Sequence, residues 1–365
     1  MIFPISHDNA ATMRRILLAA AVLALATCSL NDEGRRRDAP EDIERRIRFY
    51  TGKIERYPRL YPVYVQLANA YFQKAMLTSD PVWLALARNS LERSVAIVET
   101  HEAQVTMARI ANYAHRFDGA LRWGRRALPG PQSRETPDPG VVAVLVEAHS
   151  ALGQYDEARA LLPRDGAAPD FFTAIAHAGW FASQRRFREA SVAYDAAAEL
   201  ARESHAAKAW AHAMAGGMLI DAGDPELARP HLDAARRADA SSVQLRLHEA
   251  EYLESTRDYG KALTVYRSLL TERPGDPDLH ARAYKCAAAL GQRSDARRHF
   301  DAAAGGFRQA LDAGEVYSLG ALAQLYAEAG VNLDEAAALA ERNLQFRRDH
   351  EGRSTLARVH AARNR

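Results

Sequence analysis

The sequence predicts an all-α protein, built as a right-handed α-solenoid of about eight helix pairs with a C-terminal capping helix. The composition is the first reason: alanine supplies about a fifth of the 365 residues, whereas valine, isoleucine and threonine, which favour strands, are sparse. The second reason is a short motif that recurs with a period near 34 residues. Because 48% of the residues are hydrophobic, the chain also has enough apolar material for an extensive core.

The first expected element is a signal peptide over residues 1–27, with Met13 as an alternative start. Two arginines follow Met13, and residues 16–26 form an unbroken apolar run. Eleven residues make a helix of roughly 16 Å, which is too short for the ~30 Å hydrocarbon core of a bilayer. The run therefore indicates export rather than a permanent membrane span.

The residues that follow predict a lipid anchor and a tether. Residues 25–28 read LATC and resemble the bacterial lipobox, which implies a lipid on Cys28 and, with Ser29 after it, sorting to the outer membrane. Cleavage after Ala26 is the alternative and would give a secreted soluble protein. Residues 28–41 are polar and unpatterned, as expected of a flexible tether. We therefore expect a periplasmic, cell-envelope location.

The recurring motif consists of a short turn, an aromatic residue or its substitute, and an alanine three residues later. With Ala87 placed in front, the key alanines lie at intervals of 33, 38, 32, 38, 34, 34 and 40 residues, which is typical of a solenoid. Small residues also occur on the first helix of most units, about twelve positions before the key alanine, and they let the two helices of a unit approach closely. The motif occurs at residues 116–120, 154–158, 186–190, 224–228, 258–262, 292–296 and 332–336.

This pattern resembles the tetratricopeptide repeat, whose units are two antiparallel helices joined by a short turn. The resemblance covers residues 42–350, with a candidate joint in the proline-rich stretch 129–139. Glycines at 153, 223, 291 and 330 are placed to end first helices in a left-handed conformation. Residues 351–365 resemble a solenoid-capping helix, because they are mostly polar and carry few apolar side chains.

The resemblance implies that the first helices line a concave groove that binds a protein segment. Arg109 and Asn112 lie three residues apart on one first helix, so they are expected to share a face and to receive an acidic group beside Asn69. Apolar contacts are expected from later units. The predicted groove residues are Asn69, Phe72, Arg109, Asn112, Glu147, Trp210 and Leu247.

The sequence carries no motif of a known catalytic or cofactor site, so we expect no enzyme, no cofactor and no metal. His205 and His212 share a helix face, but two turns, or about 10 Å, is too far for one metal ion. His231 and His248 are interpreted as surface residues in the same way. The near balance of 48 basic and 46 acidic residues argues against nucleic acid as the main partner.

The predicted function is a non-catalytic scaffold or adaptor of the bacterial cell envelope, which binds a protein segment in its groove within a secretion or assembly complex. A periplasmic protein that binds peptidoglycan or another polysaccharide is the alternative. An enzyme with a site assembled from scattered residues is the third hypothesis.

Overall fold

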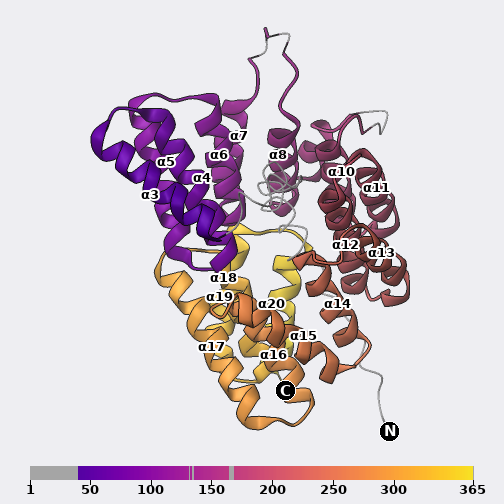
Figure 1. The fold of residues 1–365 in the computed structure, drawn as a ribbon. Helices are drawn as coiled ribbons and strands as arrows, with labels where there is room; N and C mark the ends of the chain where they lie inside the picture. Colours follow the sequence, from indigo (N-terminus) through magenta and orange to yellow (C-terminus); the bar gives the residue numbers. More distant parts are fainter. Residues whose placement is uncertain (1–39, 131, 134, 164–167, 365) are drawn as a thin grey trace.

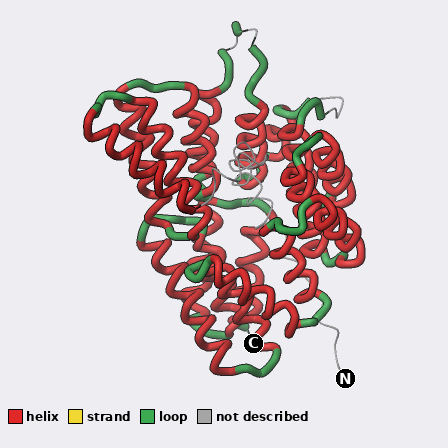
Figure 2. Tube along the Cα trace, in the orientation of Figure 1, coloured by secondary structure: helices red, strands yellow, loops and turns green. Residues whose placement is uncertain are grey.

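The structure, a computed structural model, describes residues 40–364 except 131, 134 and 164–167 (Figure 1). In this part of the chain the elements are helices and loops, without strands (Figure 2). The predicted signal peptide, Cys28 and nearly all of the tether lie outside the described residues. None of the described helices combines the length and the apolar character that a membrane span needs.

A single helix precedes eight helix pairs in the described part, and one helix follows them. The first is α3 (Pro40–Arg56), and the last is α20 (His350–Arg363). The pairs, numbered here as units one to eight, are α4 (Tyr61–Thr78) with α5 (Pro81–Ile97), α6 (His101–Tyr113) with α7 (Phe117–Ala127), α8 (Pro139–Ala151) with α9 (Tyr155–Ala160), α10 (Phe171–Ser183) with α11 (Phe187–Leu200), α12 (His205–Ala222) with α13 (Pro225–Ala238), α14 (Val243–Ser255) with α15 (Tyr259–Glu272), α16 (Pro277–Ala289) with α17 (Arg293–Asp312), and α18 (Ser318–Ala329) with α19 (Leu333–Phe346).

The pairs pack closely because small residues meet where the two helices cross. The alanines of the motif are buried on the second helices, and Ala190, Ala228 and Ala262 have no exposed surface. Gly216 on α12 shows how close the contact is, because a β-carbon there would lie 2.7 Å from a methyl carbon of Leu232 on α13. The predicted all-helical solenoid of eight pairs is therefore confirmed.

The ends of the helices are fixed by local signals. The side chain of Thr100 accepts a hydrogen bond from the Ala103 amide at the start of α6, and Asp170 does the same for Thr173 at the start of α10. Gly223 ends α12 with a φ of 88°, a left-handed conformation that glycine adopts without steric cost. The turn glycines predicted at 153, 291 and 330 also have positive φ.

The solenoid turns so far that its last units contact its first units, which is visible in Figure 1 where α18 lies below α6. We call these contacts the closing seam. It joins side chains and backbone groups that are about 200 residues apart in the sequence. The seam contains hydrogen bonds from Ser79 to Asp276 (2.8 Å), from Arg88 to Glu315 (2.5 Å) and from Arg116 to the Gly314 carbonyl (2.6 Å), and a contact between the rings of Tyr113 and Tyr317.

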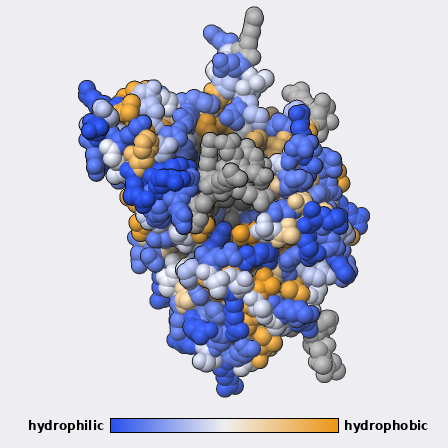
Figure 3. Space-filling model, viewed as in Figure 1, coloured by the Kyte–Doolittle hydropathy of each residue, from blue (hydrophilic) through white to orange (hydrophobic). Residues whose placement is uncertain are grey.

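The last helix, α20, packs against α18 and α19 and covers the end of the solenoid core. Its Val359 is fully buried in the same apolar cluster as Leu322 of α18. The face shown in Figure 3 is mainly hydrophilic, with apolar residues in small scattered groups. The apolar surface of the repeats is thus used mainly between helices.

Candidate partner groove

The predicted groove residues lie on first helices, as the repeat register requires. Asn69 and Phe72 are on α4, and Arg109 and Asn112 are on α6. In Figure 1 the first helices α8, α10 and α12 lie toward the middle of the molecule, and the second helices α11 and α13 lie outside them. The register is therefore consistent with a groove, although the exposure of its residues differs from the expectation.

The first unit offers less open surface than expected. Phe72 is only 3% exposed, and its ring packs edge-on against Tyr113 of the next unit at 5.3 Å between centroids. Asn69 and Arg109 are half-buried, and Arg109 already interacts with other groups of the chain. Phe72 thus belongs to the packing between the first two units.

Asn112 and Glu147 offer less open surface than expected, because Asn112 is buried and Glu147 is half-buried beside it. Asn112 has no exposed surface. Burial raises the pKa of Glu147 well above its ordinary value, while the neighbouring Asn112 amide and the Arg347 guanidinium act in the opposite direction. Asn112 is therefore not accessible to a partner in this arrangement. Its binding role stays a prediction.

The group that covers this region is the turn between α19 and α20. Arg347 is 2% exposed, and its guanidinium contacts the carboxylates of Asp349 and Glu351, each at 2.9 Å. Its positive charge also acts on Glu147 from α8. We call Glu147, Arg347, Asp349 and Glu351 the closing cluster. One buried arginine is thereby surrounded by three acidic side chains.

The same turn is held to α8 by its backbone. Arg347 and Asp349 have extended conformations, and the amides of Arg348 and Asp349 donate hydrogen bonds of 2.9 and 3.1 Å to the carbonyl of Ala151. Ala151 is the last residue of α8, where a carbonyl has no partner within its own helix. A short extended segment of the chain therefore occupies unit three as a bound peptide would.

The later units differ from the apolar surface that was expected of them. Trp210 is 5% exposed and lies 6.1 Å from the ring of Phe171, within the core of units four and five. Leu247 is half-buried and packs against the core of units six and seven. Both residues therefore contribute mostly to packing, and little of Trp210 is available to a partner.

A row of charged side chains occupies the first helices of units six and seven. Lys285 donates a hydrogen bond of 2.5 Å to Glu254, and Arg282 lies 3.4 Å from Glu251 and 3.6 Å from Glu254. Burial opposes ionisation of Glu254, but Arg282 and Lys285 outweigh it and lower the pKa of this carboxyl. The signal in the sequence was a spacing of three residues. It places Glu251 and Glu254 on one face of α14, and Arg282 and Lys285 on one face of α16.

Neither histidine pair considered from the sequence forms. The ring of His248 is buried and lies 2.7 Å from the carboxylate of Glu251. His212 instead lies near His231, which belongs to the other helix of the same unit, and both contact Asp195 of the preceding unit. The tertiary arrangement thus brings together three groups whose sequence spacing gave no signal.

No protein-family model and no curated protein matches the chain. Among solved structures it is similar to the human IFIT1 dimer with PPP-AAAA, at 17% identity, covering 87% of this chain and 73% of that one, with a TM-score of 0.43. It is also similar to a tetratricopeptide repeat protein from Parabacteroides merdae (12% identity, 82% and 98% covered, TM-score 0.34) and to yeast Tom70 (12%, 92% and 88%, 0.39). Tetratricopeptide repeat proteins are therefore among the structures that this all-helical chain resembles.

Proposed function

We propose that this protein is a non-catalytic adaptor of the bacterial cell envelope that holds an extended protein segment against its first helices, within a secretion or assembly complex. The observation that carries the proposal is the docking of residues 347–349 on α8. There the solenoid already holds an extended stretch of its own chain, through a helix-end carbonyl and a buried charge cluster.

Units six and seven also carry clustered charged side chains on their first helices, and one of these side chains is exposed. Lys285 keeps 47% of its side chain exposed, although its ammonium group contacts Glu254. Its neighbours Arg282 and Glu254 supply charges of both signs on the same inner face. A partner segment with polar and charged side chains would exchange contacts with this row, and charge-assisted hydrogen bonds of this kind are stronger than neutral ones.

Site-specific crosslinking in native cells tests the location of binding. A photoreactive residue in place of Lys285 on α16 should give adducts with one or a few proteins. The matched control carries the same residue in place of Arg297, which is 76% exposed on the second helix of the same unit. Equal adducts from both positions, or adducts only with glycan or nucleic acid, would contradict the proposal.

The envelope location is tested through Cys28. We expect wild-type protein to fractionate with membranes and to incorporate labelled fatty acid, whereas Cys28→Ser should remain unprocessed or become soluble. Labelling that persists in Cys28→Ser would reject the lipid anchor. A wild-type protein found wholly in the soluble periplasm would favour cleavage after Ala26. The adaptor proposal would then be decided by the crosslinking experiment alone.

A further inference from the structure

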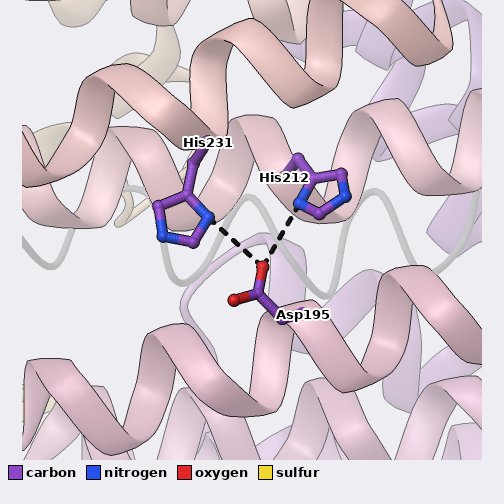
Figure 4. Close-up of side chains that lie close together, drawn as sticks. All are labelled: Asp195, His212 and His231. Atoms are coloured by element: carbon purple, nitrogen blue, oxygen red, sulfur yellow. Dashed lines mark ion pairs between the residues drawn. The ribbon is translucent and has the colours of Figure 1, made fainter.

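Three side chains that commonly bind metal ions converge at the boundary between units four and five (Figure 4). Asp195 comes from α11, His212 from α12 and His231 from α13. One carboxylate oxygen of Asp195 lies 3.3 Å from Nδ1 of His212 and 3.3 Å from Nδ1 of His231. The three ligating atoms all lie within 4.8 Å of one another. We call these residues the His–Asp cluster.

The two separations to Asp195 also fit metal coordination. Four ligand atoms placed tetrahedrally about 2.0–2.1 Å from a zinc ion stand about 3.3–3.4 Å apart. A hydrogen bond between a ring nitrogen and a carboxylate is normally shorter, about 2.7–3.2 Å. Nδ1 of His212 is a buried atom without a hydrogen-bond partner among the described residues. A metal ion between the three atoms would satisfy it.

The charges of the cluster also suit a divalent cation. Asp195 supplies a carboxylate oxygen and the two histidines supply ring nitrogens, which is a ligand set that zinc accepts. Glu199 lies one helical turn after Asp195 on α11 and acts electrostatically on His212, so a further carboxylate is available beside the cluster.

The helices hold these side chains in place while leaving access from solvent. Tyr194, next to Asp195, has no exposed surface, and Leu232, next to His231, is 4% exposed. The side chains of His212 and His231 are 21% and 17% exposed, and that of Asp195 is 49% exposed. Ligands fixed by packed helices, with an opening to solvent, are what a metal site needs.

The other close histidines of the described chain are engaged elsewhere. Nδ1 of His280 lies 2.9 Å from Nδ1 of His299, and the second nitrogen of His280 lies 2.9 Å from the Pro274 carbonyl. His248 is paired with Glu251 in a buried site. Among the described residues, the His–Asp cluster is the one group of at least three such side chains with ligating atoms this close.

We propose that Asp195, His212 and His231 form a binding site for one divalent transition-metal ion, with zinc as the best match to two nitrogen ligands and one oxygen ligand. Water completes the tetrahedron. Because Asp195 belongs to unit four and both histidines to unit five, the ion joins two successive units. The site is independent of the proposed groove.

Metal titration of tag-free, chelator-treated full-length protein tests the site. We expect one equivalent of Co²⁺ to produce the intense visible absorption of tetrahedral cobalt, and Zn²⁺ to displace it. His212→Ala, His231→Ala and Asp195→Asn should each weaken binding at least tenfold. His205→Ala is the matched control, because His205 is exposed on the same helix as His212 but outside the cluster, and it should bind normally.

Circular dichroism of each variant separates loss of the site from loss of the fold. If one histidine variant fails to fold, the other and Asp195→Asn still decide the question, since the ligands come from three helices. The proposal is overturned if wild-type protein binds no Co²⁺ or Zn²⁺. It is equally overturned if the folded variants keep the wild-type affinity.

Discussion

The closing cluster and the His–Asp cluster both gather ionisable side chains from several elements of the chain, yet they differ in how their charges are balanced. In the closing cluster, Arg347 is buried and its guanidinium contacts two carboxylates at 2.9 Å. In the His–Asp cluster, the separations are 3.3 Å and a buried nitrogen of His212 has no hydrogen-bond partner among the described residues. We therefore expect the closing cluster to stabilise the fold and the His–Asp cluster to bind a metal ion.

The largest effect should come from removing the central charge of the closing cluster. Arg347→Ala leaves the buried acids Asp349 and Glu351 without their cation, so we expect the free energy of unfolding to fall by about 3–5 kcal/mol. Urea denaturation followed by circular dichroism measures it. Arg297→Ala removes an exposed pair with Asp301 and should change nothing measurable. Similar small effects from both variants would mean that the closing cluster does not stabilise the fold.

Packing beside the His–Asp cluster should give the next largest effect. Ala190 is fully buried on α11, the helix that carries Asp195, and Ala262 is fully buried on α15. Leucine at either position should wedge a close helix pair apart and destabilise the protein by about 1–3 kcal/mol. Thermal denaturation measures the change, with the exposed Ala338→Leu on α19 as control. Neutral results at both buried positions would show that the helix register is wrong.

Glu147 makes the stability depend on pH in a direction that can be predicted. Because burial raises its pKa well above the ordinary value of 4.5, the folded state holds this proton to higher pH than the unfolded chain does. Glu147 therefore lowers the stability progressively as the pH rises above that ordinary value.

Glu147→Gln should remove this dependence. We expect the variant to match wild type in denaturant titrations near pH 4 and to be the more stable protein at pH 8. A variant that is less stable than wild type at pH 8 would show that the ionised carboxylate of Glu147 pairs productively with Arg347.

The smallest effect concerns two glycines in equivalent turns. Gly153 has a φ of 74° and faces the Arg348 carbonyl in the turn that carries the closing cluster, while Gly291 has a φ of 70° and open space around it. Alanine at either position should cost about 1 kcal/mol through backbone strain. The two costs should be similar in urea denaturation, because a β-carbon at 153 would meet Arg348 at 3.5 Å, an ordinary contact. A much larger loss of unfolding free energy for Gly153→Ala would show that Arg348 packs more tightly against residue 153 than this distance indicates.

The repeat architecture was predictable because its signals are local. Each alanine of the motif is buried against the other helix of its own unit, about twelve residues earlier in the sequence. A turn glycine such as Gly223 depends only on the positive φ of its own residue. Such features recur with the period of the unit. Eight repetitions of the same signal leave little ambiguity about the fold class.

The two clusters were not predictable, because their side chains meet only through the packing of helices against one another. Glu147 and Arg347 are about 200 residues apart, and the charge of Arg347 acts on Glu147 only because the solenoid brings its last units back to unit three. The repeat pattern placed Asn112 on an open groove, whereas Asn112 is buried. Asp195 and His231 lie on successive second helices, and their sequence positions do not indicate a shared site. Only the structure shows that His212 lies beside both of them.

The difference between the two clusters is tested most directly by measuring how zinc changes the free energy of unfolding. Wild type, Glu147→Gln and His212→Ala are unfolded with urea, each with and without Zn²⁺ at about 100 times the dissociation constant of wild type. Zinc should stabilise wild type and Glu147→Gln equally, by about 2.7 kcal/mol, and should leave His212→Ala nearly unchanged. Stabilisation of His212→Ala by the same amount, or of none of the three, would contradict the account.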